Sequence, residues 1–319
     1  MPPACCTLDL IKIRDKLKKI KKIYVGLLGG LGDLVLASTA IASLKKKYPD
    51  SHLCFGIGKE SYYEILKKDP NIDSFDDTLF YYPATKNIRK LLVRKIALLK
   101  RKLKYDLTIF LDNAENKVLN EGNHIIDNFE QLCEIKLSKR RPTVYLGEED
   151  ELAAETILTN AGIAKDEPYI VISPESRFAK ASKEWPEEKF CELVSRIKNK
   201  WGLKIITFVS PSSQKKYEGT IVVSNAPTMQ SVAAVIKRSC LFIGCDNGLT
   251  HIASAFDIDM ISVHMGYSIE ICGALSPKAV IVSSPPFLPA GKRKGPFVDP
   301  NPITVEEVFN EVDKLLPPA

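Results

Sequence analysis

The chain has 319 residues, of which 45% are hydrophobic and 26% charged, with 45 Lys and Arg against 39 Asp and Glu. This length fits two domains better than one, and the ordinary apolar content excludes a disordered or fibrous protein. No apolar run approaches the roughly 18 residues of a membrane span, and residues 1–22 lack the apolar core of a signal peptide, so we expect a cytoplasmic protein.

The first predicted strand, Ile23–Leu28, leads into a turn with three glycines, Gly29, Gly30 and Gly32. Residues 34–47 are amphipathic and predict a helix, with Asp33 just inside its start. Glycines allow a ligand to approach the backbone closely. The spacing matches neither the dinucleotide-binding fingerprint nor a Walker A loop. Two interpretations of Asp33 therefore stay open: an acid favoured by the helix dipole, or a carboxylate aimed into a cleft.

Strand-like and helical runs alternate along the rest of the chain, which predicts α/β architecture with parallel sheets. The other predicted strands are His52–Ile57, Leu107–Leu111, Tyr169–Ile172, Lys204–Val209, Ile221–Val223, Leu241–Gly244 and Met260–His264. Asp73, Asp76 and Asp77 are interpreted as an acidic loop. Arg140–Pro142 breaks the pattern and a new helix is predicted from Glu148, so we expect domains at 1–146 and 147–319.

The positive charge lies in the first half of the chain. Residues 1–150 hold 27 Lys and Arg against 20 Asp and Glu, a balance of +7, whereas residues 151–319 hold 18 against 19, a balance of −1. Lys86–Lys104 contains nine basic residues and no acid, and residues 9–22 form a second basic amphipathic stretch. Either stretch could be a helix with one packed and one solvated face, or a contact with an anionic membrane surface or phosphorylated glycolipid. Aromatic residues suited to base stacking are not interleaved, so we expect no nucleic-acid partner.

A second polar turn follows the predicted strand Leu241–Gly244 and opens a short helix. It contains Asp246, Asn247, Gly248, Thr250 and His251. Asp246 suits either a helix cap or a ligand contact, and His251 suits either a packed core or a ligand. The eight cysteines show no C-x-x-C pairing, which predicts reduced thiols and no metal site. Asp257-Ile258-Asp259 matches a D-x-D metal motif and lies in the turn between this helix and the predicted strand Met260–His264.

Three blocks in this order resemble glycosyltransferase family 9, the ADP-heptose:lipopolysaccharide heptosyltransferases. They are Gly32–Leu36 with Ala40–Leu44 and Tyr48–Asp50, then Lys183–Phe190 with its Lys-x-Trp-Pro pattern, then Asp246–Ala253 with its Asp-x-Gly-x-x-His-x-Ala pattern. Tyr105–Leu107, His124–Asp127 and Ile303–Val308 add weaker similarity. The resemblance spans roughly residue 23 to the end of the chain.

The resemblance implies a GT-B fold, in which two Rossmann-like domains with parallel sheets face each other across a cleft. It implies that the N-terminal domain binds the acceptor, with Gly29, Gly30 and Gly32 in the acceptor-side loop. Asp33 would be the catalytic base of an inverting, metal-independent displacement, and Lys183 would contact the donor diphosphate. The remaining donor-site residues implied are Ser176, Asp246, Asn247, Gly248, Thr250 and His251.

The expected function is transfer of a heptose, or a related sugar, from ADP to a lipopolysaccharide core or similar bacterial glycan. No cofactor is expected, and the expected location is the cytoplasm, peripherally on the inner membrane. A protein acceptor, a sugar-nucleotide-binding protein without turnover, and an epimerase remain alternatives. Two departures leave the nucleotide and the sugar open: Ser210–Gln214 replaces an acidic residue that can meet the nucleotide ribose, and Gly266-Tyr267-Ser268 replaces Gly-Pro-Thr.

Overall fold

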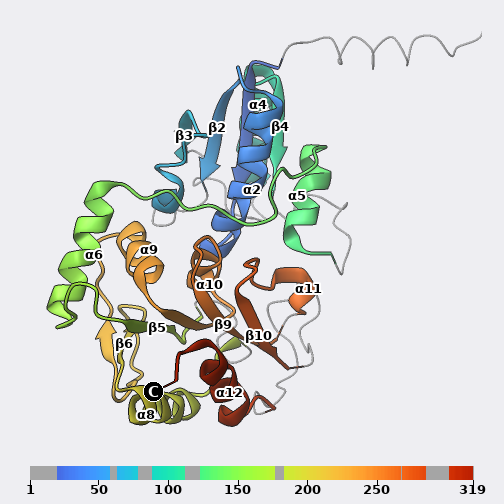
Figure 1. The fold of residues 1–319 in the computed structure, drawn as a ribbon. Helices are drawn as coiled ribbons and strands as arrows, with labels where there is room; N and C mark the ends of the chain where they lie inside the picture. Colours follow the sequence, from blue (N-terminus) through green and yellow to red (C-terminus); the bar gives the residue numbers. More distant parts are fainter. Residues whose placement is uncertain are drawn as a thin grey trace, which may run out of the picture.

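The computed structural model describes residues 20–57, 63–77, 88–111, 123–176, 183–266, 268–284 and 302–318. Two sheets, parallel throughout the described residues, form the framework (Figure 1). The first has the strand order β3-β2-β1-β4 and the second β10-β9-β8-β5-β6-β7. The predicted α/β class with parallel sheets is therefore confirmed. Most of the basic stretch at residues 9–22 lies outside the described residues. Lys86, Arg177 and Tyr267 lie outside them as well.

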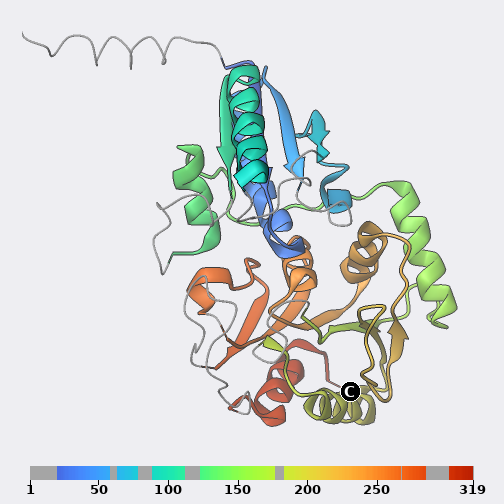
Figure 2. The same cartoon turned by 180° about the vertical axis from the view of Figure 1, so that it is seen from behind.

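The first sheet consists of β1 (Lys22–Leu27), β2 (His52–Ile57), β3 (Ser74–Asp76) and β4 (Leu107–Phe110). Its helices are α2 (Leu31–Lys47), the short 3₁₀ helix η1 (Glu64–Leu66), α4 (Ile88–Lys104) and α5 (Ile125–Cys133). Alternate residues of β1 point to opposite faces of the sheet. Ile23 and Val25 join the large core that contains α2, whereas Tyr24 faces Arg101 of α4. Hence α2 and α4 cover opposite faces, as the two views show (Figures 1 and 2).

The second sheet consists of β5 (Tyr169–Ser173), β6 (Lys204–Phe208), β7 (Ile221–Val223), β8 (Leu241–Cys245), β9 (Asp259–His264) and β10 (Ala279–Ser283). Both central strands, β5 and β8, are buried at every residue. Such continuous apolar runs are expected where helices cover both faces of a parallel sheet. The helices are α6 (Glu148–Asn160), α8 (Glu187–Trp201), α9 (Met229–Arg238), α10 (Gly248–Ala253), α11 (Ile269–Cys272) and α12 (Val305–Leu315).

The helices of the second sheet divide between its two faces. The hydrophobic side chains of α8 and α12 form one core with alternate residues of the central strands. Those of α9 and α10 lie on the other face, in a core that continues into the first sheet through α2. One core therefore joins both halves of the molecule. The two halves of this core meet at the carboxyl ends of β1 and β8. The helices α2 and α10 begin just after these strand ends.

Most predicted strands are confirmed to within one residue at each end. The predictions missed β3 and β10, and the acidic loop assigned to Asp73, Asp76 and Asp77 is wrong in part. Asp76 is the last residue of β3, and its carboxylate accepts hydrogen bonds from the buried Arg101 at 2.9 and 3.0 Å. Asp73 accepts from the backbone N–H of Leu53 at 2.7 Å. These acids hold the edge of the sheet and are not merely solvated.

Candidate active site

Asp33 lies in the first turn of α2, which begins at Leu31, three residues before the predicted start. Its carboxylate folds back and accepts a hydrogen bond from the backbone N–H of Gly30, with an N–O distance of 2.7 Å. Gly29 leaves the room for it, because a Cβ at that position would lie 2.4 Å from the Asp33 Cβ. The side chain is half-buried. The helix-start interpretation of Asp33 is therefore confirmed, and a carboxylate aimed into a cleft stays a prediction.

Asp246 and Lys183 form a buried ion pair at the carboxyl end of β8. The Lys183 Nζ lies 2.5 Å from the Asp246 Oδ2, and the two side chains are 15% and 4% exposed. Burial alone would raise the pKa of the Asp246 carboxyl. The positive field of Lys183, together with His264 and His251, outweighs burial and holds that pKa below its usual value. The carboxylate therefore stays ionised at neutral pH, and Lys183 is largely removed from solvent with it.

Asn247 and not Asp246 caps α10, so the helix-cap interpretation of Asp246 is wrong. Its Oδ1 accepts from the N–H groups of Leu249 and Thr250 at 2.9 and 3.1 Å. Its Nδ2 donates to the carbonyl of Ser173 at 3.0 Å and to that of Glu175 at 2.9 Å. The Thr250 hydroxyl donates to the carbonyl of Cys245 at 2.5 Å. The hydrogen bonds of the Asn247 and Thr250 side chains therefore fix the turn next to Asp246.

His251 lies between the two halves of the molecule. Its Nε2 is 3.9 Å from the Asp246 Oδ1, and its buried Nδ1 has no hydrogen-bond partner. Burial is the main cause that lowers the pKa of His251, to about 4, so the ring is neutral at pH 7. A Cβ on Gly32 would lie 2.6 Å from the Cδ2 of this ring. The glycine turn before α2 thus touches the turn that holds Asp246.

Gly248 makes the reciprocal approach across the same junction. A Cβ at Gly248 would lie 2.7 Å from the Cβ of Leu31, the first residue of α2. Larger residues at Gly32 or Gly248 would push α2 and α10 apart. The two glycine-containing turns, far apart in sequence, are therefore brought into contact, and Asp33 and Asp246 lie on the two sides of the contact.

His264 and Cys272 complete the surroundings of Asp246, and no sequence motif marks either residue. His264 ends β9 and Cys272 ends α11, and one ligand atom from each lies within 4.8 Å of the others and of an Asp246 oxygen. Burial, followed by the charge of Asp246, raises the pKa of the Cys272 thiol well above its usual value. These three side chains are a set that could hold a metal ion. The Lys183 ammonium already neutralises the Asp246 carboxylate, so a cation would compete with it. The D-x-D motif ends at Asp259, the first residue of β9. It therefore lies at the amino ends of the strands, whereas Asp246 and His264 lie at the carboxyl ends.

Ser176 is buried in the loop after β5, and its backbone N–H donates to the buried Glu184 carboxylate at 2.7 Å. Glu175, just before it, reaches the end of β6. Its carboxylate accepts from the N–H of Ser210 at 3.1 Å and from the Ser213 hydroxyl. The segment Ser210–Gln214 lacks an acid of its own, but Glu175 places a carboxylate at that point from another strand.

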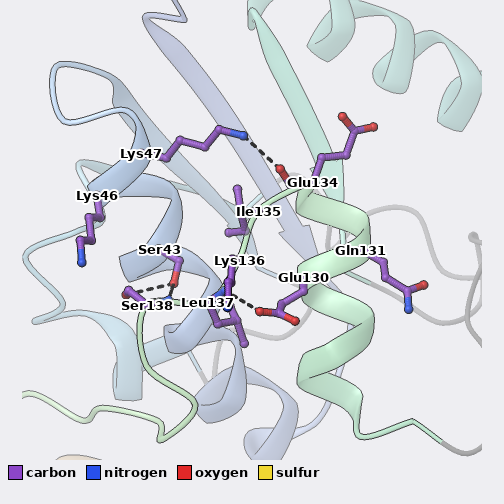
Figure 3. Close-up of a pocket in the computed structure, with 10 residues that line it drawn as sticks. All are labelled: Ser43, Lys46, Lys47, Glu130, Gln131, Glu134, Ile135, Lys136, Leu137 and Ser138. Carbon is purple, nitrogen blue, oxygen red and sulfur yellow. Dashed lines mark hydrogen bonds between the residues drawn. The ribbon is translucent and has the colours of Figure 1, made fainter.

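A hollow of about 750 Å³ opens elsewhere, at the far end of α2 (Figure 3). It lies between the last turn of α2 and the segment that contains α5 and the loop after it. Its lining residues are Ser43, Lys46, Lys47, Glu130, Gln131, Glu134, Ile135, Lys136, Leu137 and Ser138. Asp33 lies near the other end of the same helix, about 15 Å along its axis from Ser43, at about 1.5 Å of rise per residue. The hollow is therefore separate from the candidate site.

A family model and several solved structures match this chain. Residues 94–295 match the family model "Glycosyltransferase family 9 (heptosyltransferase)", which covers more than half of the chain. The chain belongs to glycosyltransferase family 9. As a family 9 protein it is a glycosyltransferase of the heptosyltransferase type, and its two parallel α/β halves with facing carboxyl ends form the expected GT-B fold. No curated protein matches the chain.

Solved structures share the fold of this family 9 glycosyltransferase at low sequence identity. A family 9 glycosyl transferase from Veillonella parvula is 19% identical, with a TM-score of 0.73 over 92% of this chain and 97% of that one. The E. coli ADP-heptose lps heptosyltransferase II is 15% identical, with a TM-score of 0.67 over 93% and 98%. The dodecameric iron-containing heptosyltransferase TibC, solved in complex with ADP-D-beta-D-heptose, is 13% identical, with a TM-score of 0.65 over 94% and 77%. In this family 9 protein, no helix among the described residues is both long and apolar enough to cross a bilayer.

Proposed function

We propose that this glycosyltransferase moves a heptose, or a related sugar, from an ADP-sugar to a lipopolysaccharide core or similar bacterial glycan, with inversion and without a metal ion. One observation carries the proposal: the Asp33 carboxylate and the Asp246–Lys183 pair come from different halves of the molecule and face one junction. The complex of TibC with ADP-D-beta-D-heptose supports the choice of donor. A cytoplasmic enzyme working at the inner membrane would meet both substrates.

Asp33 is the proposed base of the reaction. Its carboxylate takes the proton from the acceptor hydroxyl while that oxygen attacks the anomeric carbon from the face opposite the diphosphate. The new carbon–oxygen bond forms as the bond to the diphosphate breaks, and ADP leaves with the electron pair. We assign acceptor binding to residues 1–146, with Gly29, Gly30 and Gly32 giving the acceptor access to the carboxylate.

Residues 147–319 are the proposed donor side. Lys183 would neutralise charge that develops on the departing diphosphate, which is the largest electrostatic demand of the reaction. Asp246 holds the ammonium of Lys183 in place, and Asn247, Gly248 and Thr250 fix the turn. His251 supplies a neutral ring beside it. Ser176 lies in the adjoining loop, and we add Glu175, whose carboxylate at the end of β6 can accept hydrogen bonds from the nucleotide ribose.

The metal-independent part of the proposal rests on Lys183, a cation already paired with Asp246. TibC is described as iron-containing, and Asp246, His264 and Cys272 could bind a metal ion here. The proposal predicts that transfer persists at full rate after treatment with EDTA, with metal content checked by mass spectrometry. A rate lost with the metal and restored by its return would contradict it.

Asp33→Asn tests the whole proposal because it keeps the size of the side chain and removes the base. We expect the transfer rate to fall by about 100-fold or more, whereas stabilisation by ADP-heptose in a thermal shift assay persists. Asp50→Asn, at an exposed site just after α2, is the matched control and should leave both unchanged. Stabilisation only by UDP- or GDP-sugars would overturn the donor assignment. Turnover unaffected by Asp33→Asn would overturn the assigned base.

A further inference from the structure

Helix α4 exposes an apolar stripe to solvent. Leu92, Ile96, Leu99 and Leu103 are 59%, 46%, 58% and 79% exposed. Their spacing of four, three and four residues places all four side chains on one side of an α-helix, which has 3.6 residues per turn. Single exposed leucines are common on protein surfaces, but a continuous row of four marks an interaction surface.

The opposite side of α4 is fixed to the sheet by a charged residue. Arg101 lies two residues from both Leu99 and Leu103, about 200° around the helix from each. It is 7% exposed, its guanidinium is 2.9 Å from the Asp76 carboxylate, and it lies 5.1 Å from the ring centre of Tyr24. These contacts determine the rotation of the helix about its own axis. The arginine therefore faces inward and the leucines face outward, the reverse of an ordinary surface helix.

Basic side chains border the stripe on both sides. Lys95, Lys100, Lys102 and Lys104 are exposed, and the sequence of α4 has eight basic residues and no acid. A hollow of about 500 Å³ opens beside the stripe, between α4, β4 and Leu132 of α5, with Lys95 and Lys102 at its edge. A partner of this surface must therefore be apolar at its centre and negatively charged around it.

We propose that α4 docks on an anionic lipid bilayer, with the apolar stripe among the upper parts of the acyl chains and the lysines at the phosphates. Amphipathic helices with a basic border bind membranes in this way, parallel to the surface. A second copy of the chain seated on the same face would bring another eight like charges against the first. Residues 1–19 have five basic and two acidic residues and would also add positive charge. Both a second copy and residues 1–19 would place positive charge against the lysines of α4, whereas an anionic bilayer would place negative charge there.

Vesicle flotation with the full-length protein tests this inference. We expect binding to phosphatidylcholine vesicles that contain about 30% phosphatidylglycerol, and little binding to phosphatidylcholine alone. Leu99→Ser/Leu103→Ser should weaken binding at least tenfold. Lys100→Glu/Lys102→Glu should weaken it further than tenfold, because each basic residue near the surface contributes about fivefold. The matched control is Leu152→Ser/Val222→Ser, which removes exposed apolar side chains from α6 and β7 in the other half and should leave binding unchanged.

Two further measurements distinguish the occupants. In a Leu99→Trp variant, tryptophan emission should shift to shorter wavelength when anionic vesicles are added, relative to the same titration of the wild type. Sedimentation velocity should show the same oligomeric state for the wild type and Leu99→Ser/Leu103→Ser. A wild type that ignores anionic vesicles, or a stripe variant that binds them fully, would overturn the inference. A wild-type oligomer that dissociates in the stripe variant would assign the surface to a second copy. The assay requires no donor, so failure of the donor assignment leaves its result intact.

Discussion

At the scale of single residues, the site depends on a charge pair that is removed from water. Asp246 is 4% exposed, and Lys183 supplies the nearest positive charge, 2.5 Å away. Removal of one partner from such a pair leaves the other charge buried and uncompensated, which costs several kcal/mol. Exposed ion pairs contribute far less, because water and salt already screen both charges.

Lys183→Met should therefore reduce the free energy of unfolding by about 3 kcal/mol. Urea denaturation followed by circular dichroism measures this change. The control is Lys314→Met, because Lys314 is exposed and pairs with Glu311 on the surface of α12; its effect should stay below about 1 kcal/mol. Equal effects of the two substitutions would show that burial of the Lys183 pair is not a source of stability.

His251 gives the fold a dependence on pH. Its pKa is about 4 in the folded protein against 6.5 for the free side chain. Between these values the unfolded state binds more protons, so stability is full above pH 6.5 and falls as the pH drops towards 4. The charged or titratable groups that face the ring are Asp246, Lys183, His124 and His264.

His251→Asn should remove this part of the pH dependence. Between pH 7 and 4.5 we expect the wild type to lose roughly 2 kcal/mol more stability than the variant, since each pKa unit corresponds to about 1.4 kcal/mol. Denaturation curves at a series of pH values give the comparison, and the difference between the two proteins cancels contributions from other groups. Parallel curves would mean that the ring titrates normally in the folded state.

Sequence motifs located part of this site and missed the rest for a physical reason. Asp33 and Asp246 stand in local patterns of a strand, a turn and a helix, and Lys183 stands in a block that resembles the family's Lys-x-Trp-Pro motif; each can be recognised one segment at a time. His264, Cys272 and Glu175 reach the site from the ends of other elements, and nothing adjacent in sequence marks them. Their proximity comes from the strand order, which brings the carboxyl ends of β5, β6, β8 and β9 together.

At the scale of elements, α4 is held by polar contacts more than by an apolar core. Only Tyr24 and Cys54 are fully buried beneath it, with Tyr105 and Phe110 partly buried around them in the described region. Arg101 links the helix both to Tyr24 of the central strand and to Asp76 of the edge strand. Burial raises the pKa of Tyr24 well above its usual value, so its ring faces the guanidinium as a neutral phenol.

Arg101→Met should loosen α4 from the sheet. We expect a loss of about 2–3 kcal/mol in unfolding free energy, because Asp76 loses its partner and the Tyr24 ring loses a cation. Limited trypsin digestion should also cut at the lysines of α4 sooner. Arg140→Met is the matched control, since Arg140 is 54% exposed and pairs with Asp127. Unchanged protection of α4 would show that other contacts hold the helix.

The two strands that were missed both lie at the edge of a sheet. The central strands are apolar runs buried on both faces, and the sequence shows them directly. β3 has the sequence Ser-Phe-Asp and lies at the edge of its sheet, where pairing with β2 and not apolar content makes it a strand. β10 is also an edge strand, and its residues are only partly buried. An edge position alone does not hide a strand, because the edge strands β4 and β7 have apolar sequences and were predicted.

At the scale of the whole molecule, two glycines set how closely the halves approach. Gly32 lies against His251, and Gly248 lies against Leu31. Gly32→Ala should destabilise the protein by roughly 1–3 kcal/mol, the usual range for overpacking. In a His251→Ala background the space is open, and the penalty of Gly32→Ala should shrink to near zero. A penalty that is equal in both backgrounds would show that the halves do not meet at this contact.

Asp33 stands in position before any acceptor arrives. The Gly30 N–H holds one of its carboxylate oxygens, and Gly29 leaves the space that the side chain fills. The entropy cost of fixing this side chain in one rotamer therefore arises when the protein folds and does not recur at each turnover. In the proposed reaction, the base is preorganised, and the activation entropy of proton transfer should owe little to the search of Asp33 for its rotamer.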